Sequence, residues 1–413
     1  MAKFITRRIL FMLLTMFIVS IVVFIVTEIA PGNVARKVLG AFATPEQEAS
    51  FRAQLGLDQP LHIRYITWLI GSDWRASKRI GMPLRRVKKP GTEFYEWWAV
   101  DKDGTLVRWK YQEGDLIAIH LLPDGSEVES EDNTRWHTDE KGVSTFWGVD
   151  TANHAVLWEK GGQRAYWMRA KGAGWWVEQQ GGGVAYIPLQ KGLLRGDPGE
   201  SVQTGRPVAD TLVRRLRNSA ILAAIAFVIV MPLALVLGLI AGLNEGKWID
   251  RVLSISGLVT TATPEFATGI FLILIFSTWL KLLPGATVFE SENAIFKNPQ
   301  MLILPVLTLT LIELGYVLRI TRASMVEVMK TGYIRTAILK GLPYRMVVFK
   351  HALRNALMAP ITVIMLHVNW LMGGIVVVEA IFGFPGLGKY IYDSALYKDI
   401  FAIEAGAMIM VFL

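Results

Sequence analysis

Long apolar runs separated by shorter polar segments dominate the sequence. A helix needs about 20 apolar residues to cross the hydrocarbon core of a bilayer, and five runs come close to or exceed this length. They are Ile9–Val26, Ala220–Leu243, Val252–Leu280, Met301–Leu318 and Ala356–Val378. A sixth run begins at Phe401 and stops at Leu413, and at 1.5 Å rise per residue it covers only about 20 Å. The pattern predicts an all-α polytopic membrane protein with six transmembrane helices, the last of them truncated.

The composition agrees with a location in the membrane. The chain has 413 residues, 52% of them hydrophobic, and a mean hydropathy of +0.38. These values are too apolar for an ordinary soluble enzyme. The absence of cysteine excludes disulfide bonds, thiolate metal ligands and cysteine nucleophiles.

The excess positive charge is concentrated in one segment. The formal net charge is +8, and Arg319–Arg354 holds eight Lys or Arg against one acid, Glu327. Such a loop is typical of the cytoplasmic side of a membrane and unlike a basic face that binds nucleic acid. Lys3, Arg7 and Arg8 precede the first run, which no cleavage site follows. We therefore expect a retained first helix, a cytoplasmic N-terminus and no nucleic-acid partner.

Residues 72–192 have a different composition from the rest. They hold 17 Lys or Arg, 17 Asp or Glu and ten of the fourteen tryptophans. Aromatic and β-branched segments separated by turn signals, such as Asp103-Gly104, predict an antiparallel β domain. The predicted strands are Phe94–Val100, Thr105–Tyr111, Leu116–Leu122, Ala155–Trp158, Ala165–Arg169 and Trp175–Glu178.

The predicted spans place this β domain outside the cell. We expect a transmembrane helix and external segment at 1–71, a β-rich extracytoplasmic insertion at 72–192 and a transmembrane core at 193–413. The pairs Trp97-Trp98 and Trp175-Trp176 either form a stacking surface for a ligand or fill the core of a sheet or contact the membrane interface.

Several motifs outside the insertion resemble one family. Pro31-Gly32, Leu55-Gly56-Leu57, Gly196-Asp197-Pro198-Gly199-Glu200-Ser201 and Arg215-Leu216-Arg217-Asn218-Ser219 resemble the permeases of dipeptide, oligopeptide and nickel ABC importers. In that family the segments before and after residues 72–192 are close in sequence. The insertion is therefore a departure from the family pattern.

The most specific similarity lies in the basic segment. Tyr333–Leu342, followed by His351–Leu357, is similar to the EAA loop of type I ABC permeases, with Arg335 at the family's glutamate. The resemblance implies contact with a separate ATPase. The implied coupling residues are Arg335, Thr336, Ala337, Lys340, Gly341 and Leu342. The alternative is a basic loop that only fixes topology and attracts anionic lipid.

The local pattern of this segment also predicts a rigid projection. Tyr333–Leu339 favours a helix, and Gly341 can adopt the positive φ that turns the chain towards a second helix. Two short helices at an angle can fit a cleft of a partner and transmit its movement.

One motif resembles a phosphate-binding loop. Gly383–Lys389 fits G-x4-G-K, but Tyr390 follows where a Ser or Thr must hold magnesium. The motif also follows a membrane helix and lies on the external side. We therefore expect no cofactor in this chain, with ATP and magnesium held by partner subunits.

Ionisable residues inside apolar runs are costly and are candidates for function. The tentative translocation-path residues are Pro264, Glu265, Glu313, His367 and Asn369. The alternative is that these groups pair with one another or with a partner to fix helix packing.

The resemblance implies a non-catalytic permease of an ATP-driven importer in a bacterial or archaeal inner membrane. Its expected partners are a homologous second permease, two ABC ATPase subunits, an extracytoplasmic solute-binding protein and the lipid bilayer. Peptides are the expected substrates, with nickel, glutathione, opines or sugars as alternatives. Two other functions stay open. A membrane sensor would need a cytoplasmic signalling domain, and an ion-coupled secondary transporter would use Glu265 and Glu313 without an ATPase.

Overall fold

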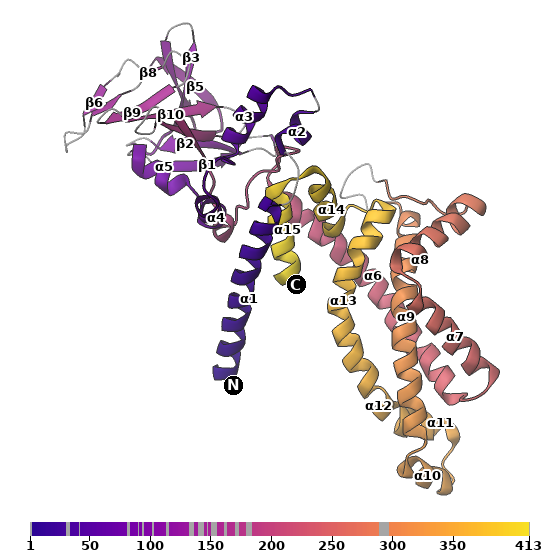
Figure 1. Ribbon diagram of the computed structural model, residues 1–413. Coiled ribbons are helices and arrows are strands. Elements are labelled where there is room, and N and C mark those ends of the chain that lie inside the picture. Colours follow the sequence, from indigo (N-terminus) through magenta and orange to yellow (C-terminus); the bar gives the residue numbers. More distant parts are fainter. Residues whose placement is uncertain are drawn as a thin grey trace. The chain divides into compact units, whose positions relative to one another are not determined.

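The computed structural model (Figure 1) divides the chain into two compact units. The first comprises residues 1–211 and 394–412, and the second comprises residues 212–393. The described residues are 2–29, 34–40, 42–80, 83–89, 91–92, 95–100, 103–112, 115–131, 136–138, 144–146, 148–149, 155–160, 163–169, 173–178, 184–288 and 297–412.

The first unit contains the long helix α1 and several shorter helices besides the strands of the insertion. The helices are α1 (Ala2–Ile29), α2 (Val34–Leu39), α3 (Pro45–Gln54), α4 (Leu61–Ile70), α5 (Asp73–Ile80), the 3₁₀ turn η1 (Leu193–Arg195) and α15 (Ile400–Phe412). Helix α1 packs on α15. Phe24, Trp68 and Met408 form the buried core between α1, α4 and α15, and the rings of Phe24 and Tyr65 meet edge to face at 5.3 Å. Apolar side chains thus join segments far apart in sequence.

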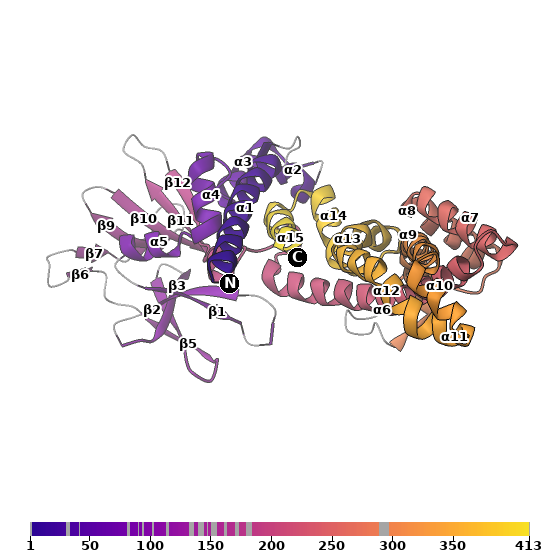
Figure 2. The same ribbon diagram turned by 90° about the horizontal axis from the view of Figure 1, so that it is seen from below.

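The insertion folds as two antiparallel sheets and a short hairpin. One sheet has the order β1-β2-β3-β4-β5 and the other β12-β11-β10-β9-β8, and Figure 2 shows them as separate groups of strands. The strands are β1 (Leu84–Lys88), β2 (Tyr95–Val100), β3 (Leu106–Gln112), β4 (Asp115–Leu121), β5 (Glu127–Glu131), β6 (Trp136–Thr138), β7 (Ser144–Phe146), β8 (Gly148–Val149), β9 (Ala155–Lys160), β10 (Gln163–Arg169), β11 (Ala173–Glu178) and β12 (Val184–Pro188). The predicted β-rich insertion is confirmed, and each of the six predicted strands overlaps an observed one.

The positions of Trp97 and Trp98 decide between a ligand-stacking surface and a role inside the insertion for this pair. Both side chains are buried in the β1–β5 sheet, so they fill the interior of the insertion and are not available as an external stacking surface. The side chains of Trp175 and Trp176 lie outside the described part of the chain, although their backbone forms β11.

The insertion begins and ends at one tightly closed root. The backbone N–H of Ser72 donates to the carbonyl of Gln190 at 2.8 Å, and the N–H of Gln190 donates to Ser72 Oγ at 3.0 Å. Gly71 and Gly192 both have positive φ, 99° and 95°, and a Cβ at either would collide with the backbone of the opposite segment. Glycine is therefore required on both sides of the root.

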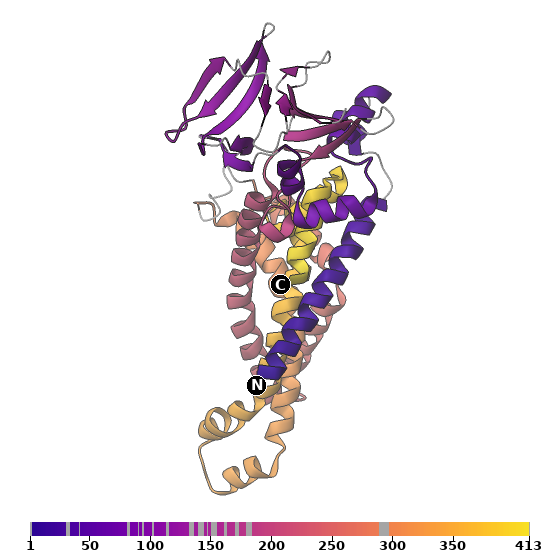
Figure 3. The same ribbon diagram turned by 90° about the vertical axis from the view of Figure 1, so that its left-hand side faces the viewer.

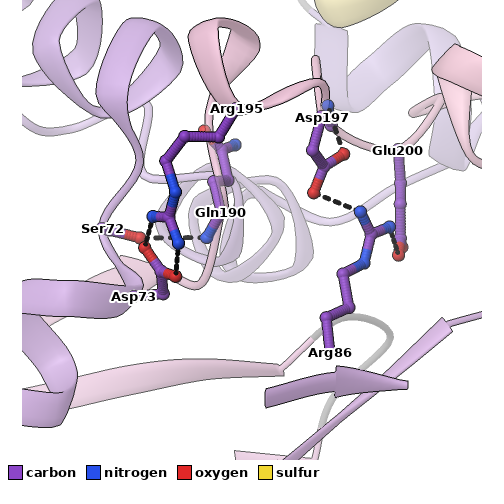
Figure 4. A network of polar contacts seen from close by, with 8 residues as sticks. Ser72, Asp73, Arg86, Gln190, Arg195, Asp197 and Glu200 are labelled. Atoms are coloured by element: carbon purple, nitrogen blue, oxygen red, sulfur yellow. Dashed lines mark hydrogen bonds and ion pairs between the residues drawn. The ribbon is translucent and has the colours of Figure 1, made fainter. Parts of the chain in front are cut away.

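Two arginines fasten this root (Figure 4). Arg195 donates to both carboxylate oxygens of Asp73, at 2.6 and 2.8 Å. Arg86 on β1 pairs with Asp197 and, at 3.0 Å, with Glu200. Bidentate and bridging arginine pairs fix geometry as well as charge, so the first sheet is tied to the segment that follows the insertion.

The second unit is a helical bundle. Its elements are α6 (Val208–Leu243, the first residues of which belong to the first unit), α7 (Trp248–Ala262), α8 (Glu265–Leu272), the π-helix η2 (Ile273–Trp279), α9 (Gln300–Met329), α10 (Gly332–Leu339), α11 (Tyr344–Met346), the π-helix η4 (Val347–Ala352), α12 (Leu353–Ala356), α13 (Met358–Phe382) and α14 (Leu387–Tyr397, up to Asp393). Its central core consists of apolar side chains from α6, α8, α9 and α13.

Small residues let α6 and α9 approach closely. A Cβ at Gly238 would lie 2.5 Å from Thr321 Cβ, and one at Gly242 would lie 2.7 Å from Met325 Cβ. Real Cβ atoms do not come so close, so this GxxxG pair forms a helix contact that larger residues would prevent.

The apolar run Val252–Leu280 was expected to form one helix, and this expectation is wrong. Helices α7 and α8–η2 meet at 107°. Pro264 disfavours the helical conformation of the residue before it, and Thr263 accordingly has ψ 126°. Glu265 therefore lies in the first turn of α8. A carboxylate is stabilised there by the helix dipole.

The remaining predicted spans correspond to observed helices. Among the described residues, three helices are long and apolar enough to cross a membrane: Lys3–Ile29, Val208–Leu243 and Gln300–Met329. Three bent helix pairs raise the number to as many as six. Helix α15 is a shorter apolar helix at the position of the sixth run.

Candidate coupling loop and intramembrane polar site

The segment between α9 and α13 forms a projection with its own core. Figures 1 and 3 show α10 and α11 beyond the ends of α9 and α12. The buried side chains are Met325, Ile334, Ala337, Val347, Val348, Ala352 and Ala356, with Leu342 packed against them. Leu239 and Leu243 of α6 and Val328 and Met329 of α9 also pack on this core, so α10 is joined to the ends of both helices.

A left-handed turn ends α10. Gly341 has φ 76°, a conformation that glycine adopts without steric cost, and the chain reverses there towards α11. Asn355 Nδ2 donates to the hydroxyl of Tyr333 at 2.8 Å, and Ser324 Oγ donates to the carbonyl of Ala356 at 2.8 Å. The two arms of the projection are therefore hydrogen-bonded as well as packed.

The predicted coupling residues divide by burial. Arg335, Thr336, Lys340 and Gly341 are exposed on the outer face of the projection, whereas Ala337 is buried and Leu342 is half-buried. The exposed group can meet a partner, and the buried pair keeps the projection folded.

Sequence reasoning missed the apolar part of this outer face. Leu339 is 80% exposed, and Ile338, Tyr344 and Phe349 are also exposed. The sequence does contain a signal for this face. Apolar residues alternate there with basic ones in a helix and turn that are too short to bury all of them. An exposed apolar patch with a polar rim is typical of a protein contact.

A buried ion pair fixes the base of the projection. Arg322 on α9 donates to both oxygens of Asp250 on α7, at 2.5 and 2.7 Å. The N–H of Gly246 and the hydroxyl of Ser254 also donate to Asp250. Since Asp250 is buried and accepts four hydrogen bonds, it holds the ends of α6, α7 and α9 in one arrangement.

The intramembrane polar residues come partly together. Glu313 on α9 is buried, and its Oε2 lies 2.6 Å from His367 Nδ1 on α13. The His367 ring also packs on Tyr316 at 4.5 Å. Glu313 Oε1 has no hydrogen-bond partner within the described part of the chain. This pair matches the helix-packing alternative, because it joins α9 to α13.

The other candidates behave differently. Glu265 is half-buried at the bend between α7 and α8 and close enough to Glu313 for the two charges to interact, while Pro264 beside it is exposed. Asn369 lies on α13, but its side chain is outside the described residues. Glu265 is thus the most accessible carboxylate among the candidates.

The segment that resembles a phosphate loop is occupied by a carboxylate of the chain itself. Glu379 accepts from Ser219 Oγ at 2.5 Å and from the N–H of Lys389 at 3.1 Å. Asn218 Nδ2 donates to the carbonyl of Pro385 at 2.9 Å. A phosphate bound to this segment would meet the Glu379 carboxyl group, and the absence of nucleotide binding here stays a prediction.

Family models match two parts of the chain. The model described as "Binding-protein-dependent transport system inner membrane component" matches residues 234–413, and the N-terminal model of such membrane components matches residues 1–79. Most of the insertion lies between the two matched regions.

Curated relatives agree with these models. The oligopeptide transport system permease protein AppB of Bacillus subtilis is 34% identical over 229 residues, 55% of this chain and 72% of that protein. The probable D,D-dipeptide transport system permease protein DdpB of Escherichia coli is 32% identical over 250 residues, covering 55% and 74%. The glutathione transport system permease protein GsiC of Shigella flexneri is 36% identical over 215 residues, covering 51% and 67%. With its apolar helices and these matches, the chain belongs to the family of binding-protein-dependent inner membrane components, the multi-pass permeases of ABC transporters.

Proposed function

We propose that this permease carries peptides inward and takes its drive from separate ATPase subunits that bind the projection. The chain itself is non-catalytic, and ATP and magnesium belong to the partner subunits. A homologous second permease completes the translocation path, and a soluble binding protein delivers the substrate from outside. The observation that carries the proposal is a rigidly cored projection whose outer face is both basic and apolar.

The packing of the projection supports a role in transmitting movement from separate ATPase subunits to the permease. Its core packs against α6 and α9, so a push on α10 is transmitted as a rigid-body movement rather than absorbed by a flexible loop. Arg335 replaces the family's glutamate, and we propose that the exposed apolar side chains supply the main contact energy, since apolar anchors dominate protein interfaces.

Substitution of the most exposed leucine tests the coupling. Leu339→Glu places a charge in the interface, and we expect at least a tenfold loss of ATPase co-purification, because a charge buried without a partner costs several kcal/mol. Leu194→Glu is the matched control, since Leu194 is also strongly exposed but lies in the first unit. Equal recovery of the ATPase with both variants would contradict the proposal.

The orientation follows from the same segment. The eight basic residues of Arg319–Arg354 favour the cytoplasm, and on this ground we propose that the N-terminus lies inside and the insertion outside. Labelling of single cysteines by a membrane-impermeant maleimide checks this directly in a chain that has no native cysteine. Ser126→Cys is expected to react in intact cells, and Lys340→Cys only after lysis.

Peptides are the proposed substrates because two of the similar permeases are named for oligopeptide and D,D-dipeptide transport. A third is named for glutathione, itself a peptide-like solute. Uptake of labelled di- and oligopeptides, compared with nickel, glutathione, opines and sugars, distinguishes these classes. Uptake that persists after ATPase inactivation would favour an ion-coupled transporter.

We propose Glu265 as the translocation-path residue and Glu313–His367 as a packing pair. Glu265→Gln is expected to lower uptake of substrates with a free amine by about tenfold, the loss typical of one hydrogen bond to a charged group. Protein yield stays normal because Glu265 is half-exposed. Glu46→Gln, at an exposed acid of α3, serves as the control. Unchanged uptake of every substrate would remove Glu265 from the path.

A further inference from the structure

A cavity in the first unit takes no part in the proposed function. Its volume is about 30 Å³, enough for a small polar head group, and it is partly open to the surface. Its walls come from the C-terminal end of α1, the loop and helix at residues 55–68, and the start of α15. Phe24, Trp68 and Phe401 give it aromatic sides. The cavity therefore combines an apolar wall with the charged groups described next.

The charges that line the cavity do not balance. Glu28 and Arg64 form an ion pair, and Arg64 also interacts electrostatically with Glu404. Arg52 and Lys398 also act on Glu28, whereas Arg64 is the one cation found to act on Glu404 among the described residues. Glu404 is fully buried, and a buried carboxylate without its own cation is strongly unfavourable. Because Arg64 is paired with Glu28, Glu404 has no ion pair of its own in the described part of the chain, which leaves a place for a positive group beside it.

Three buried polar atoms of the lining residues lack hydrogen-bond partners in the described ranges of the chain. Glu404 Oε1 accepts from Thr27 Oγ1 at 3.0 Å, but its Oε2 accepts nothing. Thr67 Oγ1 and Trp68 Nε1, on neighbouring residues of α4, are also unpartnered. Buried polar groups are nearly always satisfied, so three around one cavity call for a ligand.

The chemistry of the three atoms defines that ligand. A carboxylate oxygen only accepts, an indole N–H only donates, and a hydroxyl can do either. A water molecule could satisfy part of this set but would bring no positive charge. The ligand must therefore carry a cationic donor and, close to it, a hydrogen-bond acceptor.

We propose that this cavity binds a primary ammonium group adjacent to a carbonyl oxygen, the chemistry shared by a free amino acid and the N-terminal residue of a peptide. The ammonium donates to Glu404 Oε2 and Thr67 Oγ1 and supplies the missing charge. The carbonyl accepts from Trp68 Nε1, and the aromatic walls favour the cation further. The proposal does not depend on ATP coupling, since binding is a property of the chain alone.

Calorimetry on the full-length chain in lipid nanodiscs tests the proposal without any substitution. Glycinamide, which has the ammonium and the carbonyl but no carboxylate, is expected to bind. N-acetylglycinamide lacks the ammonium, and ethylammonium lacks the carbonyl. Each is expected to bind at least about tenfold more weakly than glycinamide, because one lost hydrogen bond or charge contact costs about 1.4 kcal/mol or more. Equal binding of all three compounds would show that the cavity does not select the ammonium and the carbonyl, and no binding of glycinamide would mean that it holds water only; either result would overturn the proposal.

Two conservative variants locate the site. Glu404→Gln keeps the shape and removes the charge, with an expected 10- to 100-fold weaker binding of glycinamide, roughly the effect of losing a charged hydrogen bond. Trp68→Phe removes the indole N–H, with an expected loss of about three- to tenfold. Glu46→Gln and Trp248→Phe, at exposed sites, are the matched controls. Unchanged affinity in both cavity variants would overturn the assignment.

Glycine and glycylglycine distinguish the two sources of the ligand. Tight binding of glycine alone assigns the site to free amino acids, and tight binding of glycylglycine alone assigns it to peptide N-termini. Failure of both, when glycinamide binds, would exclude these natural sources and overturn the proposal in its physiological form.

Discussion

Asp399 links two distant parts of the first unit. It lies between α14 and α15, is buried, and accepts hydrogen bonds from Ser201 Oγ and, at 3.0 Å, from the N–H of Val202. Burial raises the pKa of Asp399 above its ordinary value, although the hydrogen bonds from Ser201 and Val202 act in the opposite direction. Burial likewise raises the pKa of Glu200 despite its pairing with Arg86.

These raised pKa values predict a pH dependence of known sign. A carboxyl group whose pKa is higher in the folded state contributes stability at pH values below its unfolded pKa, near 4, and this contribution is lost as the pH rises through the folded pKa. Asp399→Asn removes the titration and keeps a hydrogen-bonding side chain. Its thermal stability relative to the wild type should therefore increase between pH 4 and pH 8.

Asp124 supplies a control of opposite sign. Its pKa is lowered by hydrogen bonds from Ser126 at an exposed turn. Asp124→Asn should consequently gain no stability relative to the wild type as the pH rises. A parallel response of both variants would mean that Asp399 does not titrate as its surroundings require.

At the scale of elements, the sequence predicted which segments form helices and strands better than where helices bend. Apolar runs and turn signals located the spans and six strands, because burial and turn chemistry act locally. The 107° bend could have been predicted from Pro264. The continuous apolar run on both sides of this proline instead favoured a single helix. Strand β5 was not predicted because three of its five residues are glutamates, although it pairs with the neighbouring strand β4.

The candidate site shows the same division. Glu313 and His367 were found because charge inside an apolar run is conspicuous. Asp250, Arg322, Glu379 and Glu404 were not singled out, because they lie near the ends of such runs, where polar residues are ordinary. The packing of α7 on α9 brings Arg322 to Asp250, and the packing of α1 on α15 brings Thr27 to Glu404.

The anchor of the projection gives a prediction at this scale. Arg322→Met leaves Asp250 buried without its cation and is expected to destabilise the second unit by about 2–4 kcal/mol, somewhat below a fully buried pair because Arg322 is partly exposed. Adding Asp250→Asn should recover part of the loss. A denaturation midpoint measured for the four members of this double-mutant cycle gives the coupling energy.

The exposed pair Lys330–Glu245, at 2.8 Å, is the matched comparison. The same cycle at this pair, Lys330→Met with Glu245→Gln, should yield a coupling of about 0.5 kcal/mol or less. Similar energies at both pairs would show that burial of Asp250 contributes nothing to the anchor.

For the whole molecule, the closed root implies that the insertion can be removed as a unit. Residues 74–188 can be replaced by a linker of about three residues, because Ser72 and Gln190 are hydrogen-bonded neighbours. Asp197→Asn and Glu200→Gln should accompany the deletion, since both carboxylates lose Arg86. We expect membrane insertion and ATPase binding to persist, as measured by yield and co-purification.

The deletion without the two substitutions is the control and should give a lower yield. Loss of membrane insertion in both forms would instead mean that residues 72–192 are an integral part of the fold. Peptide uptake by the substituted form then tells whether the insertion takes part in transport.

The geometry of this root also makes it a suitable site for inserting other folded domains into the permease. Any module whose own termini lie side by side can replace residues 74–188, held at its base by Asp73 and Arg195 and by the backbone pairing of Ser72 with Gln190. A fluorescent protein or a rigid fiducial placed there would mark the position of the insertion while leaving the sequence of the membrane helices and of the projection unchanged.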